Sequence, residues 1–286
     1  EIIADESEDG SNEEEAKEES KKDDRELISE FVEEFIFYEG LLKSYQDPEN
    51  GNTYLELSDE DISKEFIYFA HIINGTVEAG LFKGSHIDQA VIKFEKQFNS
   101  LNLIRVNTGF YFDPNSELSR QSQSNISDSV IENFEITHKN DDETTYLIDI
   151  TKLLKSDNLT KLKSEPRDYD SDSFQVGSLS RSKTAISKIY NYPKNTDFEV
   201  DYVFSNPASY ESLRNTSVKL RYTFLEMPQD NGFEIRFEDP RIGYFTDRVT
   251  DLSSTEITPY RDLVQKWNLQ KQNPDSAKSK PIKPIK

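Results

Sequence analysis

The three histidines come first, because imidazole is a common zinc ligand and general base. His71, His86 and His138 are spread along the chain, and no two stand at the i, i+4 spacing of an HExxH zinc helix. His71 lies in an apolar stretch, where a hydrogen-bonded imidazole of a core or an interface is the usual case. Cysteine is absent, which excludes thiolate metal sites and disulfides. We therefore predict no catalytic residue and no metal ligand within this chain.

Two other patterns with possible chemistry are incomplete. Asp168, Asp170 and Asp172 have the alternate spacing of a calcium loop, but Ser173 stands where an EF-hand has glycine. Residues 177–180 (GSLS) resemble a nucleophile loop only superficially, because the sequence shows neither a strand–turn–helix frame nor a partner histidine. We expect neither stretch to be a site.

The most unusual cluster is the run DPRIGYF at residues 239–245. Pro240 is expected to fix a turn, and Arg241 to pair with a carboxylate or a carbonyl. Tyr244 and Phe245 are expected to anchor the turn in a core. We interpret the run as a structural corner at a domain junction, since structural arginine pairs are commoner there than substrate-binding arginines. The predicted junction residues are Asp239, Pro240, Arg241, Gly243, Tyr244, Phe245 and Trp267.

The segments that must position these residues are predominantly β-forming. Residues 65–73 (EFIYFAHII) are aromatic and β-branched almost throughout, which is typical of a strand buried on both faces. Further strands are predicted at 41–45, 53–57, 90–96, 101–107, 134–138, 145–149, 184–192, 198–204 and 217–225, with turn residues between them. The predicted fold is mainly β (α+β), with curved antiparallel sheets or a sandwich and a few short helices.

Three segments favour helix. Apolar residues recur at helical spacing from Leu27 to Ile36, which predicts a helix that begins near Arg25 with Asp24 as its N-cap. A short helix is expected within residues 116–131, and another near 151–157.

Composition limits the partners. The chain has 286 residues and a net charge of −21, which disfavours nucleic acid because phosphate binding needs a basic surface. No apolar run approaches the roughly 20 residues of a membrane span. Residues 1–24 form an acidic, low-complexity arm that we predict to be disordered. Residues 25–250 form the β-rich region, with a candidate break between two subdomains near 155–173.

Several motifs together resemble a family of large zinc-dependent metalloproteases, mostly of Bacteroidetes. DPRIGYF at 239–245 is followed by Asp247, YR at 260–261, KWNL at 266–269 and KPIKPI at 280–285. Upstream, residues 40–46, 54–57, 63–67 and 191–195 look like that family's opening hairpin, next strand and Pro-Lys-Asn turn. The resemblance covers roughly residues 38–286.

The resemblance implies a function outside these residues. It predicts a non-catalytic N-terminal region of an exported protease, located in the periplasm, on the outer-membrane surface or outside the cell. Residues 251–286 would link it to a metzincin-like catalytic domain, and zinc is expected only there, with no cofactor in this chain. The implied partners are that downstream domain and a protein or peptide substrate. The residues themselves leave open an alternative, a cell-surface module that binds glycan or peptide on exposed aromatics such as Phe110, Tyr111 and Phe112.

Overall fold

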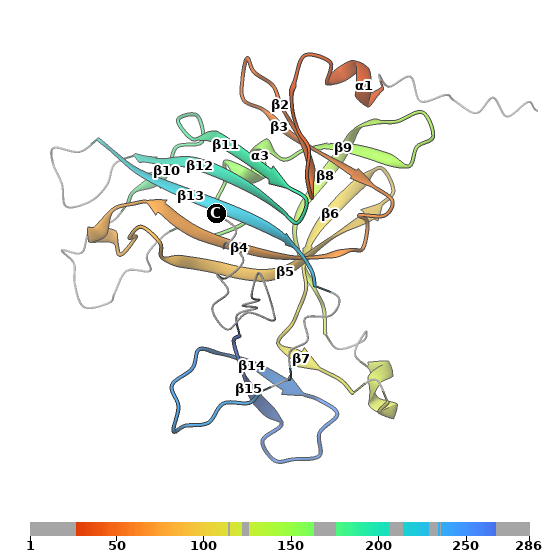
Figure 1. Ribbon diagram of the computed structural model, residues 1–286, viewed down its shortest axis with the longest axis vertical. Helices are drawn as coiled ribbons and strands as arrows, with labels where there is room; N and C mark the ends of the chain where they lie inside the picture. The colour runs from red at the N-terminus through yellow and green to blue at the C-terminus, as the bar shows by residue number, and fades with distance from the viewer. Residues whose placement is uncertain are drawn as a thin grey trace, which may run out of the picture.

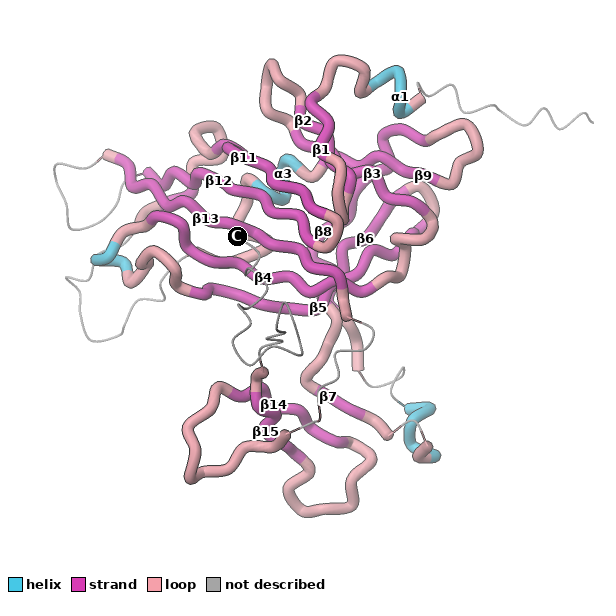
Figure 2. The backbone as a smooth tube through the Cα atoms, viewed as in Figure 1, coloured by secondary structure: helices cyan, strands magenta, loops and turns pink. Residues whose placement is uncertain are grey.

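The computed structural model describes residues 27–113, 115–121, 126–162, 176–205, 214–228, 234 and 236–266. Figure 1 shows a broad, twisted sheet with a much smaller sheet beneath it. Strands predominate and helices are short, as Figure 2 makes clear. The prediction of a mainly β fold with antiparallel sheets is confirmed.

In the described residues the large sheet contains twelve strands, ordered β1-β2-β3-β9-β8-β6-β5-β4-β13-β12-β10, with β11 beside β12. Neighbouring strands are antiparallel throughout. The strands are β1 (Ile36–Tyr38), β2 (Lys43–Gln46), β3 (Thr53–Ser58), β4 (Glu65–Asn74), β5 (His86–Gln97), β6 (Ser100–Arg105), β8 (Ser129–Lys139), β9 (Thr145–Asp149), β10 (Ser178–Leu179), β11 (Ala185–Tyr192), β12 (Asn195–Ser205) and β13 (Asn215–Glu226).

The remaining elements are short. The small sheet is ordered β15-β14-β7 and comprises β7 (Phe110–Tyr111), β14 (Thr246–Asp251) and β15 (Tyr260–Val264). The helical pieces are α1 (Ile28–Phe31), α3 (Thr151–Leu154) and the 3₁₀ turns η1 (Val77–Ala79) and η2 (Glu117–Gln121).

The main core lies on one face of the large sheet. Alternate residues of β4, including Phe66, Tyr68 and Ile72, are fully buried, while the residues between them are only half-buried. The prediction that this strand is buried on both faces is therefore wrong. The strand belongs to an antiparallel sheet, and such sheets commonly pack only one face on the core.

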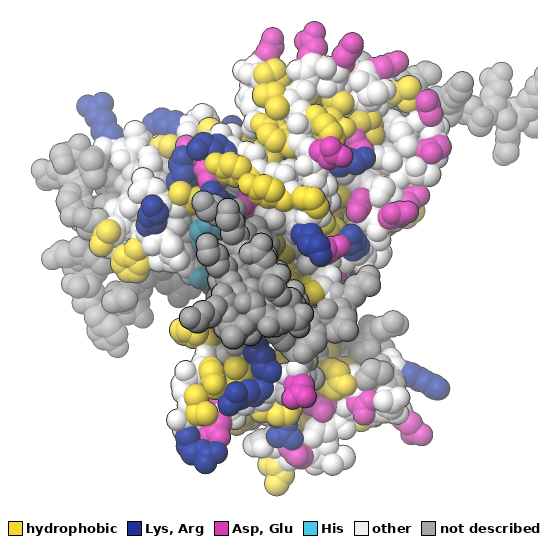
Figure 3. All heavy atoms as spheres, viewed as in Figure 1, with side chains coloured by type: hydrophobic (Ala, Val, Ile, Leu, Met, Phe, Trp, Pro, Cys, Tyr) yellow, Lys and Arg dark blue, Asp and Glu magenta, His cyan; other side chains and the backbone are white. Residues whose placement is uncertain are grey.

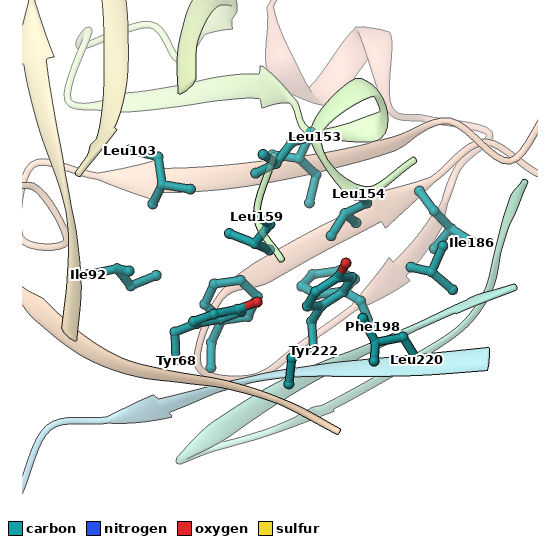
Figure 4. Close-up of a cluster of buried hydrophobic side chains, with 14 of the residues drawn as sticks. Tyr68, Ile92, Leu103, Leu153, Leu154, Leu159, Ile186, Phe198, Leu220 and Tyr222 are labelled. Atoms are coloured by element: carbon teal, nitrogen blue, oxygen red, sulfur yellow. The ribbon is translucent and has the colours of Figure 1, made fainter. Parts of the chain in front are cut away.

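Leucines of α3 and the segment after it cover this core. In Figure 4, Leu153, Leu154 and Leu159 lie over Tyr68 and Tyr222. Hydroxyl groups fix this layer: Tyr202 Oη donates to the Leu154 carbonyl at 2.5 Å and lies 2.6 Å from Tyr222 Oη. Burial raises the pKa of both tyrosines, so they remain neutral donors.

Two helix predictions need correction. Instead of a long first helix, the described residues from 27 onward are helical only at Ile28–Phe31, and Ile36–Tyr38 pair with β2. Phe31 and Phe35 pack against Tyr54 of β3 with ring centroids 5.4 and 5.6 Å apart, so tertiary packing uses the apolar stripe without a continued helix. Among the described residues of 116–131, only the 3₁₀ turn η2 is helical, and Val130 and Ile131 belong to β8 beside β6. The helix predicted near 151–157 is confirmed as α3.

The predicted boundaries fall as follows. Residues 1–24 lie outside the described part of the chain, as do 163–173 of the candidate break. Leu159 and Leu162, in the described part of that break, belong to the main core. Residues 260–264, within the stretch expected as a linker, form β15 and pair with β14.

Candidate functional site

The small sheet brings together segments far apart in the sequence. β14 and β15 are antiparallel, with Arg248 opposite Asp262 and Thr250 opposite Tyr260. β7 joins β14 in parallel, with Phe110 opposite Thr250. Residues 236–238 extend the sheet, since Glu238 N donates to Asp262 O at 2.8 Å and Val264 N to Arg236 O at 2.9 Å. The strand preceding DPRIGYF is therefore an edge of this sheet.

Within DPRIGYF, the arginine pairs with its own turn. Arg241 Nε and Nη2 donate to the two carboxylate oxygens of Asp239 at 2.9 and 2.5 Å, and Arg241 N donates to Asp239 Oδ1 at 3.0 Å. These hydrogen bonds lower the pKa of Asp239 and raise that of Arg241. The expectation of a carboxylate partner agrees with this geometry. The Arg241 side chain is 85% exposed, so solvent weakens the pair and its role is to shape the turn.

The aromatic residues of the motif do not lie where we predicted. Tyr244 is 42% exposed and Phe245 is 87% exposed, so the expectation that they anchor in a core is wrong. The reason is that no second layer covers this sheet in the described chain. Pro240 and Gly243 are also exposed, and Trp267 lies outside the described residues.

Arginines stack on the neighbouring aromatic rings. The guanidinium groups of Arg248, Arg236 and Arg261 lie 4.4, 5.0 and 5.8 Å from the ring centroids of Tyr260, Tyr244 and Phe237, respectively. Planar guanidinium groups favour such stacking. These arginine–aromatic contacts were not predicted from the sequence. The signal that could have indicated them is the R-x-T pattern in β14 opposite the Y-x-D pattern in β15.

Carboxylates hold two of these arginines in place. Arg248 donates to both oxygens of Asp262 at 2.8 and 2.9 Å, which lowers the pKa of Asp262. Arg261 donates to Glu256 at 2.8 Å. The guanidinium planes are therefore oriented before any partner binds.

This region differs from the rest of the molecule in how little of it is buried. No described residue from 234 to 266 is buried. Figure 3 shows hydrophobic and basic side chains side by side over the small sheet. The exposed large apolar residues here are Phe110, Tyr111, Phe237, Ile242, Tyr244, Phe245, Leu252, Ile257 and Tyr260. An accumulation of exposed apolar residues of this kind marks an interaction surface.

A protein-family profile described as "Domain of unknown function (DUF5117)" matches residues 84–272. The chain belongs to this family. The matched segment runs from just before β5 to just past β15, so it includes the small sheet and DPRIGYF. No curated protein and no solved structure matches the chain.

A second polar cluster lies on β4, β12 and β13, on the face away from the main core. Arg221 pairs with the buried Glu199 and lies 3.8 Å from the carboxylate of buried Asp197. Burial raises the pKa of Asp197, while burial and then the charge of Arg221 lower that of His71. Among the described residues, neither His71 Nδ1 nor Arg221 Nε has a hydrogen-bond partner. The prediction of a hydrogen-bonded imidazole is therefore not met at Nδ1.

The other candidates contribute no assembled site. No group of three or more potential metal ligands exists among the residues that the structure describes. The Asp168–Asp172 pattern lies outside them. Ser178 and Leu179 form β10, paired with β12. His86 is exposed. The ring of His138 stacks on that of Phe31, with the ring centroids 3.9 Å apart. No helix in the described part is long and apolar enough to cross a membrane.

Proposed function

We propose that this chain is the non-catalytic, β-rich N-terminal region of an exported zinc-dependent metalloprotease, and that its small sheet docks the catalytic domain. The observation that carries the docking is the exposure of the small sheet. A three-stranded sheet needs a covered apolar face for independent stability, and here no residue of the sheet is buried by the part of the chain that the structure describes.

The composition of the exposed surface fits a protein partner. Aromatic residues and arginine are enriched in protein interfaces, and clusters of them contribute most of the binding free energy. Tyr260 with Arg248, and Phe237 with Arg261, provide such clusters. The carboxylate pairs orient the arginines and so reduce the entropy lost on docking.

The position of the surface supports an intramolecular partner. The sheet contains β15, which ends at Val264, close to the KWNL and KPIKPI stretches that resemble the protease family's inter-domain segment. A domain attached beyond these stretches would meet the small sheet at a high effective concentration. Zinc and the general base would reside in that domain, and this chain would support it or shape its cleft.

The assignment is tested by comparing the full product of the gene with this chain alone. We expect the full product to bind zinc stoichiometrically and to cleave denatured casein, and this chain to do neither. Metal analysis and a casein digest measure both properties. Tight zinc binding or cleavage by the 286-residue chain would sink the assignment.

The docking is tested in the full product with Phe245→Ser. Loss of this highly exposed aromatic side chain should weaken docking by about 2 kcal/mol and reduce the activity of the catalytic domain. Phe82→Ser is the matched control, because Phe82 is 52% exposed on a loop of the large sheet. Equal activity of the two variants would argue against docking at this surface.

A second candidate is direct binding of peptide or glycan by the aromatic residues of β7. The exposure of Phe110 and Tyr111, at 44 and 47%, favours it. A double Phe110→Ser, Tyr111→Ser variant of this chain should then lose retention on a peptide or glycan array. Retention by the unmodified chain that this double variant abolishes would favour this candidate over docking.

A further inference from the structure

The tip of the β5–β6 hairpin combines two locally unfavourable features. Gln97 pairs with Ser100, so Phe98 and Asn99 form a two-residue turn. Phe98 has a φ of 54°, in the left-handed region that bulky side chains rarely adopt, and its side chain is 92% exposed. A tight two-residue hairpin turn requires a positive φ, but glycine or asparagine usually provides it, so an exposed phenylalanine here is locally unfavourable. Such departures from local rules concentrate at functional sites.

A ladder of amide side chains lies beside this ring. Asn133 Nδ2 of β8 donates to Asn102 Oδ1 at 2.6 Å and to Ser100 Oγ at 2.9 Å. Asn102 Nδ2 then donates to Gln97 Oε1 at 3.0 Å. These bonds fix the side-chain rotamers across three strands, so the surface is organised before a ligand arrives.

The ends of the ladder keep hydrogen-bonding capacity. Within the described residues no protein group bonds to Gln97 Nε2 or to Asn133 Oδ1, which leaves one amide donor and one amide acceptor. Glu135 follows two residues after Asn133 on the same exposed face of β8 and adds a carboxylate acceptor. All three groups line one open depression of about 700 Å³, together with Phe98 and Val130.

We propose that this depression binds a neutral saccharide. Adjacent sugar hydroxyls both donate and accept, which matches the Gln97 amide donor and the Asn133 and Glu135 acceptors. The apolar C–H face of a pyranose ring fits against an exposed aromatic ring such as that of Phe98.

Other ligand classes fit the depression less well. None of its described lining residues is Lys or Arg, so a phosphate or carboxylate ligand would have no cation to bind. An extended peptide would need a free strand edge, and β5, β6 and β8 each have strands on both sides.

The saccharide site does not depend on the docking proposal. The Phe98 turn precedes β6 and β7 comes after it, so the two surfaces lie toward opposite ends of this strand. Loss of saccharide binding in a Phe98 variant would leave docking intact, and a failure of docking would leave the saccharide site untouched.

The test is titration calorimetry of the 286-residue chain against neutral gluco-, xylo- and mannohexaose. We expect at least one hexaose to bind with a Kd below about 5 mM, a weak affinity that calorimetry measures. Phe98→Asn removes the ring and places at this φ a residue that tolerates it. We expect its affinity to fall at least tenfold while its melting temperature does not fall.

Two further variants distinguish binding in this depression from binding to any exposed aromatic side chain. Phe82→Asn should bind like the unmodified chain, and Glu135→Ala should bind more weakly. Absence of binding by all three hexaoses, or equal binding by Phe98→Asn, would overturn the proposal.

Discussion

The large and small sheets follow the same hydrogen-bonding rules but differ completely in burial. Strands β12 and β13 of the large sheet bury Phe198, Tyr202 and Tyr222 completely. The small sheet buries no described residue and is held by backbone pairing and by arginine pairs open to water. Because apolar burial is the dominant stabilising term, the large sheet carries its own stabilising core. In our proposal, the small sheet is completed by a surface of the downstream domain.

Core truncation should give the largest contrast between the two sheets. Phe198→Ala removes a fully buried ring from β12 and should cost about 3–5 kcal/mol. Phe245→Ala removes a ring that is 87% exposed and should change the stability by less than about 0.5 kcal/mol. Urea unfolding of the chain, followed by far-UV circular dichroism, measures both. Similar losses would mean that the small sheet has a core of its own.

Arginine replacement should sharpen the comparison at a smaller scale. Arg221→Met leaves Glu199 and Asp197, which are 4% and 3% exposed, without their cation and should cost about 3 kcal/mol. Arg248→Met breaks a bidentate pair on the small sheet and should leave the urea midpoint unchanged, because water solvates Asp262. A destabilisation by Arg248→Met as large as that by Arg221→Met would contradict this account.

The smallest expected effect is on the pH dependence of the free energy of unfolding. The pKa of His71 is lowered from 6.5, so below that pH the unfolded chain takes up a proton that the folded chain refuses. Its contribution to stability is therefore lost as the pH falls through 6.5 toward the lowered value. Asp197, whose pKa is raised, acts with the opposite sign but is common to all variants compared.

His71→Gln should accordingly lose less stability than the unmodified chain between pH 7 and pH 5. His86→Gln, at the exposed position opposite His71 on β5, removes only the smallest of the effects that lower the pKa of His71, and should change the slope less than His71→Gln. Urea midpoints at the two pH values measure the slopes, and an unchanged slope in His71→Gln would refute the burial argument.

Most strands of the large sheet could be predicted from the sequence, because short local patterns of residues mark them. Turn residues such as Asn50-Gly51 mark the β2–β3 hairpin, and alternating aromatic residues mark β12 and β13. The sequence-based prediction failed where tertiary packing overrides the helical spacing of apolar residues. The apolar stripe from 27 to 36 fits a helix, yet Phe31 and Phe35 pack around Tyr54 and the helix is not continued.

The candidate site was only partly predictable. The Arg241–Asp239 pair is a local contact within three residues and could be anticipated from the motif. The pairing of β7 with β14 spans about 140 residues, and no local pattern indicates it. The exposure of Phe245 could not be predicted either, because an aromatic side chain is equally apolar in a core and on an exposed surface.

Hydrogen exchange tests the central claim most directly, by comparing this chain with the full product of the gene. The amides of β14 and β15 should exchange at least 100-fold more slowly in the full product, a change of about 2.7 kcal/mol in local opening. The amides of β12 and β13 should exchange equally in both. Equal exchange of β14 and β15 in the two proteins would contradict the proposal that the small sheet is completed by a downstream domain.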